Sequence, residues 1–122
     1  LPAIEEKEES QPTKESEGDR ELEDEMAKLL LYLQQGVVLG DYAEALHIPE
    51  RKLSVFINST YGVSFKRWVN NKRVEYATEQ MAKHPDYTME RIAELSGFAH
   101  KSHFCKIFRE ITGGSFTEYK NR

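Results

Sequence analysis

A segment that occurs twice constrains the fold of this chain more than any other feature. Residues 56–68 read FINSTYGVSFKRW and residues 107–119 read IFREITGGSFTEY, at an offset of 51 positions. Each copy begins with two bulky apolar residues and then carries a glycine, a Ser-Phe pair and a final aromatic residue. Self-similarity at a fixed spacing indicates one structural unit built twice. We therefore expect the protein to act at two places a fixed distance apart.

Charge is distributed unevenly along the 122 residues. Residues 1–25 contain eleven Asp/Glu against three Lys/Arg, a net charge of −8, whereas residues 26–122 contain fourteen Lys/Arg against ten Asp/Glu, a net charge of +4. The acidic segment has too few large apolar residues to offset the entropy lost on ordering. We expect residues 1–20 to form an acidic, disordered linker. Because the chain starts with this linker at Leu1, we also expect it to be the C-terminal piece of a longer protein.

Several classes of protein are not expected. Cys105 is the only cysteine, so an intrachain disulfide is impossible and a reducing, cytoplasmic location is favoured. No apolar run approaches the ~18 residues that a membrane span needs. The run His100-x-x-His103-x-Cys105 does not place its three side chains on one helix face, so we expect no metal site. Paired carboxylates, phosphate-binding glycine loops and Ser/His/Asp patterns are missing, so we expect neither enzyme activity nor a cofactor.

Apolar residues recur three and four positions apart over most of the chain, and no alternating pattern of useful length is present. This periodicity predicts an all-α fold. The expected helices, about seven, cover residues 21–35, 39–46, 49–61, 65–83, 88–96, 102–113 and 116–119. Ser64 and Thr88 are predicted N-caps, and Gly62 and Gly113 are predicted to end the helices before them.

A short helix also precedes the helix in which each copy of the repeat begins. Ala43 in the first copy and Ala93 in the second are small enough to let another helix cross closely, and a turn of three or four residues then begins that helix. This arrangement is a helix-turn-helix, whose second helix enters the major groove in DNA-binding versions. We expect a first subdomain over residues 21–64, a linker helix over 65–84 and a second subdomain over 85–122.

The C-terminal run RIAELSGFAHKSHFCKIFREITGGSFTEYKNR strongly resembles the signature of the AraC/XylS family of bacterial transcription regulators. The matching positions are Ile92-Ala93, Gly97-Phe98, Ser102-His103-Phe104, Phe108, Gly113, Ser115 and Tyr119. The sequence departs from the family pattern at Phe116, where proline is usual, and at Lys120, where arginine is usual. The first half also fits the family, so the resemblance covers about residues 21–122.

The resemblance implies two helix-turn-helix units, joined by one long helix, that read successive major grooves on one face of double-stranded DNA. A linker helix of ~19 residues is about 28 Å long, close to the ~34 Å that separates successive major grooves. Two unequal reading heads predict a non-palindromic promoter site. The resemblance also implies transcription regulation, contact with RNA polymerase, and a sensor domain N-terminal to this chain. The alternative from another class is a helical protein-interaction module that does not bind DNA sequence-specifically.

Exposed positions near the start of each second helix are the candidates for reading bases. They are Arg51, Ser54 and Val55 in the first unit, and Lys101, Ser102, His103 and Lys106 in the second. The candidates for DNA-backbone contact are Lys52, Asn58, Lys66, Arg67 and Arg109. Arg73 is interpreted as an internal, salt-bridging residue of the linker helix. Tyr61, Phe65 and Trp68 are expected to belong to the core rather than to a base-stacking surface.

Overall fold

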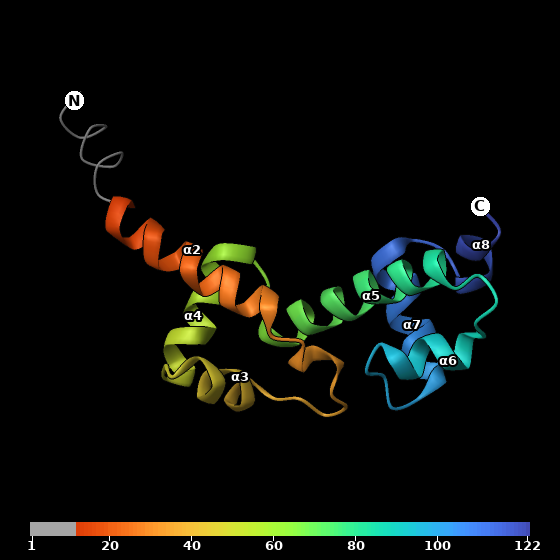
Figure 1. Ribbon diagram of the computed structural model, residues 1–122, viewed down its shortest axis with the longest axis horizontal. Helices are drawn as coiled ribbons and strands as arrows, with labels where there is room; N and C mark the ends of the chain where they lie inside the picture. The colour runs from red at the N-terminus through yellow and green to blue at the C-terminus, as the bar shows by residue number, and fades with distance from the viewer. Residues whose placement is uncertain (1–11) are drawn as a thin grey trace, which may run out of the picture.

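The computed structural model describes residues 12–122, in which it shows seven α-helices, one short 3-10 helix and no strand. The α-helices are α2 (Pro12–Lys28), α3 (Leu39–Leu46), α4 (Glu50–Tyr61), α5 (Phe65–Lys83), α6 (Met89–Leu95), α7 (Lys101–Thr112) and α8 (Phe116–Lys120), and the 3-10 helix is η1 (Leu31–Leu33). Helices α2, α3 and α4 gather at one end of the long helix α5, and α6, α7 and α8 gather at the other (Figure 1). The predicted all-α fold is confirmed.

The helix caps follow the sequence closely. The Ser64 hydroxyl accepts a hydrogen bond from the Arg67 backbone N–H at 3.2 Å, and the Thr88 hydroxyl does the same for Arg91 at 3.1 Å. Gly62 and Gly113 end α4 and α7 with φ of 72° and 83°, a left-handed conformation that costs glycine little. These predicted caps are confirmed, and they place the two second helices, α4 and α7, in equivalent positions of the two units.

The N-terminal helix differs from the prediction. It begins at Pro12 instead of about Glu21, so the expectation of a disordered linker is wrong for residues 12–20; residues 1–11 lie outside the described part. Once Met26 is packed, adding polar turns to an existing helix is easier than starting one, and acidic residues near a helix N-terminus favour its dipole. The disordered-linker expectation considered composition alone and missed this cooperativity.

Helix α2 also ends earlier than expected, at Lys28 instead of Gln35. The buried Tyr42 hydroxyl accepts a hydrogen bond from the Tyr32 backbone N–H at 3.0 Å and donates one to the Leu29 carbonyl at 3.4 Å. These bonds draw the chain into the 3-10 turn η1 instead of a further α-helical turn. A contact between segments ten residues apart thus overrides the local helical periodicity.

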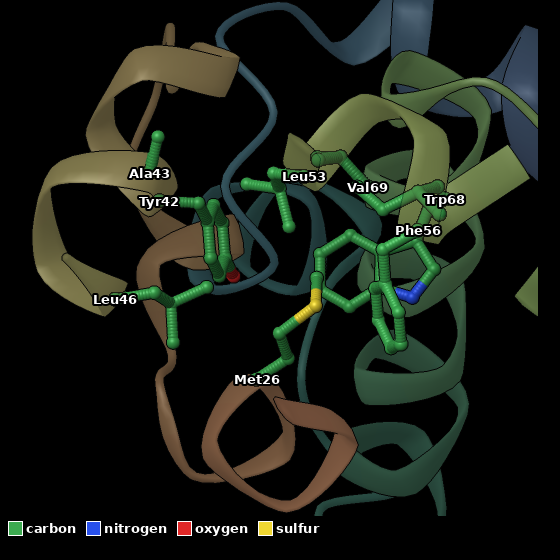
Figure 2. Packing of buried hydrophobic residues seen from close by; sticks show 9 residues of the cluster. Met26, Tyr42, Ala43, Leu46, Leu53, Phe56, Trp68 and Val69 are labelled. Carbon is green, nitrogen blue, oxygen red and sulfur yellow. The ribbon is translucent and has the colours of Figure 1, made fainter. Parts of the chain in front are cut away.

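The first hydrophobic core is formed by α2, α3, α4 and the beginning of α5. Figure 2 shows the side chain of Met26 reaching from α2 toward Phe56 and Trp68. Met26 is 1% exposed, and Tyr42 packs edge-to-face on Trp68 with ring centroids 5.4 Å apart. Trp68 is itself buried, which confirms its assignment to the core. Helix α2 is therefore an integral part of the first unit.

The second core lies at the other end of α5 and is built around aromatic rings. Phe104 of α7 contacts Phe98, Phe108 and Phe116, with ring centroids 5.2, 5.5 and 6.0 Å apart. Phe116, at the position where the family usually has proline, is buried against this cluster. The aromatic side chain there adds apolar surface to a small core.

Candidate nucleic-acid interface

Helix α4 buries one face and exposes the other. Leu53, Phe56 and Ile57 point into the first core. Of the predicted contact residues on this helix, Arg51, Lys52, Val55 and Asn58 are exposed, and Ser54 is half-buried. Val55 is 61% exposed, so its apolar side chain is accessible to a binding partner. The exposed face therefore carries two cationic side chains beside one apolar side chain.

Helix α7 is arranged in the same way in the second unit. Phe104, Ile107 and Phe108 point into the second core. The predicted contact residues of this helix all lie on its exposed side: Lys101, Ser102, His103, Lys106 and Arg109. These donor and cationic groups suit an anionic partner, although the carboxylate of Glu110 is exposed on the same helix.

Some candidate side chains already have intramolecular partners. Lys101 pairs with Glu90 at 3.1 Å, and Arg67 lies 3.9 Å from Glu110. All four side chains are about half exposed or more, so a partner can displace these pairs at small cost. Asn58 donates one amide hydrogen to the Ser54 carbonyl at 3.1 Å, which leaves its second hydrogen for another partner.

A cavity of about 300 Å³ opens between the two units. Its lining residues are Gly36, Val37, Val38, Leu39, Phe65, Lys66, Val69, Asn70, Arg73 and His103, with no carboxylate among them. Lys66 belongs to α5 and His103 to α7, so their proximity could not be predicted from the sequence. Asn70 and Arg73 are buried polar residues that sequence reasoning did not assign to a site; their only signal was a polar side chain at an inward position of the linker helix.

Cationic side chains surround His103, which lines the cavity. Burial lowers the pKa of His103, and the nearby charges of Lys66, Arg73, Lys106 and His100 lower it further. The imidazole therefore stays neutral more readily here than in water. A phosphate placed in or beside this cavity would reverse the effect, because it favours the protonated ring.

Arg73 does not form the internal salt bridge that the sequence suggested. Among the side chains that the structure describes, those of residues 18–122, its guanidinium has no carboxylate within 4.0 Å; it donates instead to the carbonyls of Tyr32 at 2.6 Å and Gln34 at 2.8 Å. The sequence pattern could not reveal these partners, because they lie 41 and 39 positions away in the chain.

Residues 42–122 match the model of a helix-turn-helix domain family of the AraC/XylS type. The chain belongs to this family. Regulatory protein PocR of Salmonella typhimurium is 30% identical over 105 residues, which cover 83% of this chain and 34% of that protein. The regulator YijO of Escherichia coli is 30% identical over 80 residues, or 66% of this chain and 28% of that protein. The chain thus spans about a third of the length of the curated relatives it matches.

Solved structures show the same fold. The C-terminal domain of AraT, a response regulator from Geobacillus stearothermophilus, superposes with a TM-score of 0.71 at 25% identity, covering 84% of this chain and 83% of that one. The DNA-binding domain of AdpA, solved in complex with a target DNA, gives a TM-score of 0.69 at 22% identity, covering 82% and 89%. The resemblance found in the sequence is confirmed: the chain belongs to a family of helix-turn-helix domains, and its curated relatives are named as regulators.

No described helix has both the length and the apolar composition of a membrane span.

Proposed function

We propose that this chain binds double-stranded promoter DNA sequence-specifically, with α4 and α7 in successive major grooves. The observation that carries the proposal is that α4 and α7 each expose cationic side chains and lie at opposite ends of one continuous helix. Figure 1 shows this placement of the two helices along α5. Helix α5 has 19 residues; at 1.5 Å per residue it is about 28 Å long, close to the rise of one DNA turn. The AdpA domain, which shares the fold, was solved with its target DNA.

The proposal gives different roles to the two groups of exposed residues. The base-reading residues are Arg51, Ser54 and Val55 in α4, and Lys101, Ser102, His103 and Lys106 in α7. Arginine and lysine suit guanine edges, and an exposed valine suits a thymine methyl group. Lys52, Asn58, Lys66, Arg67 and Arg109 contact phosphates and hold the register. Because the two reading faces differ in sequence, the site is non-palindromic.

In this proposal the chain is the DNA-binding domain of a longer regulator. Its curated relatives are about three times as long as the matching segment, and the AraT neighbour is the C-terminal domain of a response regulator. A sensor N-terminal to the domain and a contact with RNA polymerase complete the proposed mechanism. The site of action is chromosomal DNA in the cytoplasm.

The experiment that tests the proposal is selection of binding sites from a randomised double-stranded DNA pool, followed by anisotropy titration at several salt concentrations. Arg51→Ala and Lys101→Ala are expected to weaken binding to the selected site by about 1–3 kcal/mol each and to relax specificity at one position. Lys52→Ala and Arg109→Ala are expected to weaken selected and random DNA alike and to reduce the salt dependence. Lys83→Ala, at the far end of α5, is the matched control for loss of one charge.

Two outcomes would contradict the proposal. If no sequence is enriched over random DNA and affinity does not depend on salt, the chain is a protein-interaction module. If a sequence is enriched but Arg51→Ala and Lys101→Ala behave like Lys83→Ala, the assigned reading faces are wrong.

A further inference from the structure

Helix α5 carries two buried polar residues between the two hydrophobic cores. Val69 is the last α5 residue of the first core, and Val74 is the first α5 residue of the second. Asn70 and Arg73 lie between them and are 7% and 8% exposed. A buried charge is costly unless hydrogen bonds compensate it, so the partners of Arg73 indicate why it is there.

Arg73 contacts both units at once. Its Nε and one terminal nitrogen donate to the carbonyls of Tyr32 and Gln34, in the segment that connects α2 to α3 in the first unit. Its guanidinium also lies over the ring of Phe98, in the α6–α7 turn of the second unit, 5.5 Å from the centroid. Burial lowers the pKa of Arg73. The side chain is thus held by backbone carbonyls and an aromatic face instead of by a carboxylate.

The same connecting segment also touches the second unit directly. A Cβ atom on Gly97 would lie 2.8 Å from the carbonyl oxygens of both Tyr32 and Leu33, so the two backbones meet with no room for a side chain. Gln35 donates from its amide to the Phe98 carbonyl at 3.4 Å. Residues 32–35, Arg73 and Gly97-Phe98 therefore form one junction, which we call the inter-unit junction.

We infer that the inter-unit junction fixes the separation of α4 and α7, and that Arg73 is the positioning residue that sets which half-site spacing the protein accepts. Without the junction, α5 would be the main connection between the cores, and the second unit could rotate about it. Adding one base pair moves a half-site by ~3.4 Å and turns it by ~34° about the DNA axis. If the separation of α4 and α7 is fixed, the two helices cannot follow that movement. If the junction is loosened, they can. The inference rests on the proposed function.

Lysine is not expected to replace arginine here. The two carbonyls receive hydrogen bonds from different nitrogens of one planar guanidinium, and an ammonium group cannot reproduce that geometry or the flat contact with Phe98. Arg73→Lys should therefore resemble Arg73→Gln in the assays below, which separates positioning from charge alone.

The first experiment measures the separation of the units without DNA. Spin labels at Glu44→Cys in α3 and Glu94→Cys in α6, both exposed, are placed in a Cys105→Ser background for pulsed electron–electron resonance. We expect one narrow distance distribution, which broadens or shifts with Arg73→Gln. Lys72→Gln is the matched control, because Lys72 is the neighbouring α5 cation and its ion pair, with Glu75 at 3.7 Å, lies within α5 itself. A folded Arg73→Gln protein with an unchanged distribution overturns the inference.

The second experiment measures spacing tolerance on the DNA selected by the unaltered protein. One base pair is inserted or removed between the half-sites, and an isolated half-site serves as reference. We expect the unaltered protein to lose at least about tenfold in affinity with either change, as for one lost base contact. The Arg73→Gln protein should discriminate far less between the spacings while binding the isolated half-site equally well. Equal discrimination by both proteins overturns the inference.

Failure of the inference and failure of the proposed function are distinguishable. If the unaltered protein selects no sequence, the proposed function fails and the spacing role fails with it. If it selects a sequence with strict spacing that Arg73→Gln leaves unchanged, only the inference fails. Should Arg73→Gln not fold, Gln35→Ala removes one contact of the same junction at an exposed residue. It must then cause a smaller change in the same direction, and no change would overturn the inference.

Discussion

Lys101 in α7 donates a hydrogen bond from Nζ to the carboxylate of Glu90 in α6, across 3.1 Å. The pair connects the two helices of the second helix-turn-helix at the end where α7 begins. A backbone hydrogen bond at the start of α6 and the Lys101 ammonium together hold the pKa of Glu90 below its usual range. Both side chains are more than half exposed, so the pair adds little to stability and DNA can compete for the ammonium.

Replacing Glu90 by Gln is therefore expected to increase affinity for the selected DNA. The change frees Lys101 and removes one negative charge beside the reading face, which corresponds to roughly a two- to fivefold gain for an exposed pair. Anisotropy titration at low and moderate salt measures the effect. Glu94→Gln removes a charge from the same helix without breaking an ion pair among the side chains of residues 18–122. Equal gains from both variants would show that the Lys101 contact has no specific role.

We expect the titration of His103 to have opposite effects on folding stability and on DNA affinity as the pH falls. Its pKa lies below the ordinary value because of burial and neighbouring positive charges. Below the unfolded-state pKa of about 6.5, the unfolded chain binds a proton that the folded chain does not, so this group lowers stability as pH falls through that value. Nearby DNA phosphates favour the protonated ring, so affinity should rise over the same range.

The measurements for His103 are urea unfolding and DNA titration at pH values between 5 and 8. His103→Gln should remove its share of both pH dependences, leaving the contributions of other groups. His84→Gln is the control, because His84 stacks on Tyr87 at the end of α5 that lies beside the second core, with ring centroids 4.2 Å apart. If DNA affinity falls as pH decreases, His103 does not face phosphate.

The sequence predicted the parts of this fold that local chemistry determines. The caps at Ser64 and Thr88 and the helix ends at Gly62 and Gly113 depend on residues within a few positions of one another. Each copy of the repeat is likewise a short local pattern, which is why comparing the two copies revealed it. The family resemblance was readable for the same reason, since its motifs are local. The fold class and the positions of α4 and α7 therefore followed from the sequence alone.

Long-range contacts explain what the sequence did not predict. The end of α2 depends on the Tyr42 hydroxyl, and the role of Arg73 depends on carbonyl groups about forty positions away. Backbone carbonyls have no side-chain signature, so no pattern in the sequence could indicate them. The cavity that brings Lys66 and His103 together is likewise a product of packing between the units.

Met26→Ala is expected to destabilise the first unit. Met26 is 1% exposed and joins α2 to the rings of the first core (Figure 2), so its truncation should lower the free energy of unfolding by about 2–5 kcal/mol. Urea denaturation followed by circular dichroism measures the loss. Lys28→Ala, exposed on the same helix, should change it by no more than about 0.5 kcal/mol. A small effect of Met26→Ala would mean that α2 is not part of the core in solution.

Phe116 offers a test that separates backbone fit from side-chain packing. Its ring contacts Phe104 and Phe108, with centroids 6.0 and 6.2 Å apart, so Phe116→Ala should cost about 3–5 kcal/mol. Phe116→Pro should cost less. Phe116 is the first residue of α8, where proline is favoured, and Ser115 before it is already extended, with φ of −78° and ψ of 163°. Proline also reduces the entropy of the unfolded chain.

Urea unfolding of the two Phe116 variants ranks these effects, and Thr117→Ala, exposed in the same helix, is the control. If Phe116→Pro is the more destabilising variant, the backbone at the start of α8 does not accept proline. If it is the less destabilising variant, the chain has exchanged a rigid first helical residue for apolar surface. That exchange would explain how a family position usually held by proline can carry phenylalanine in both copies of the repeat.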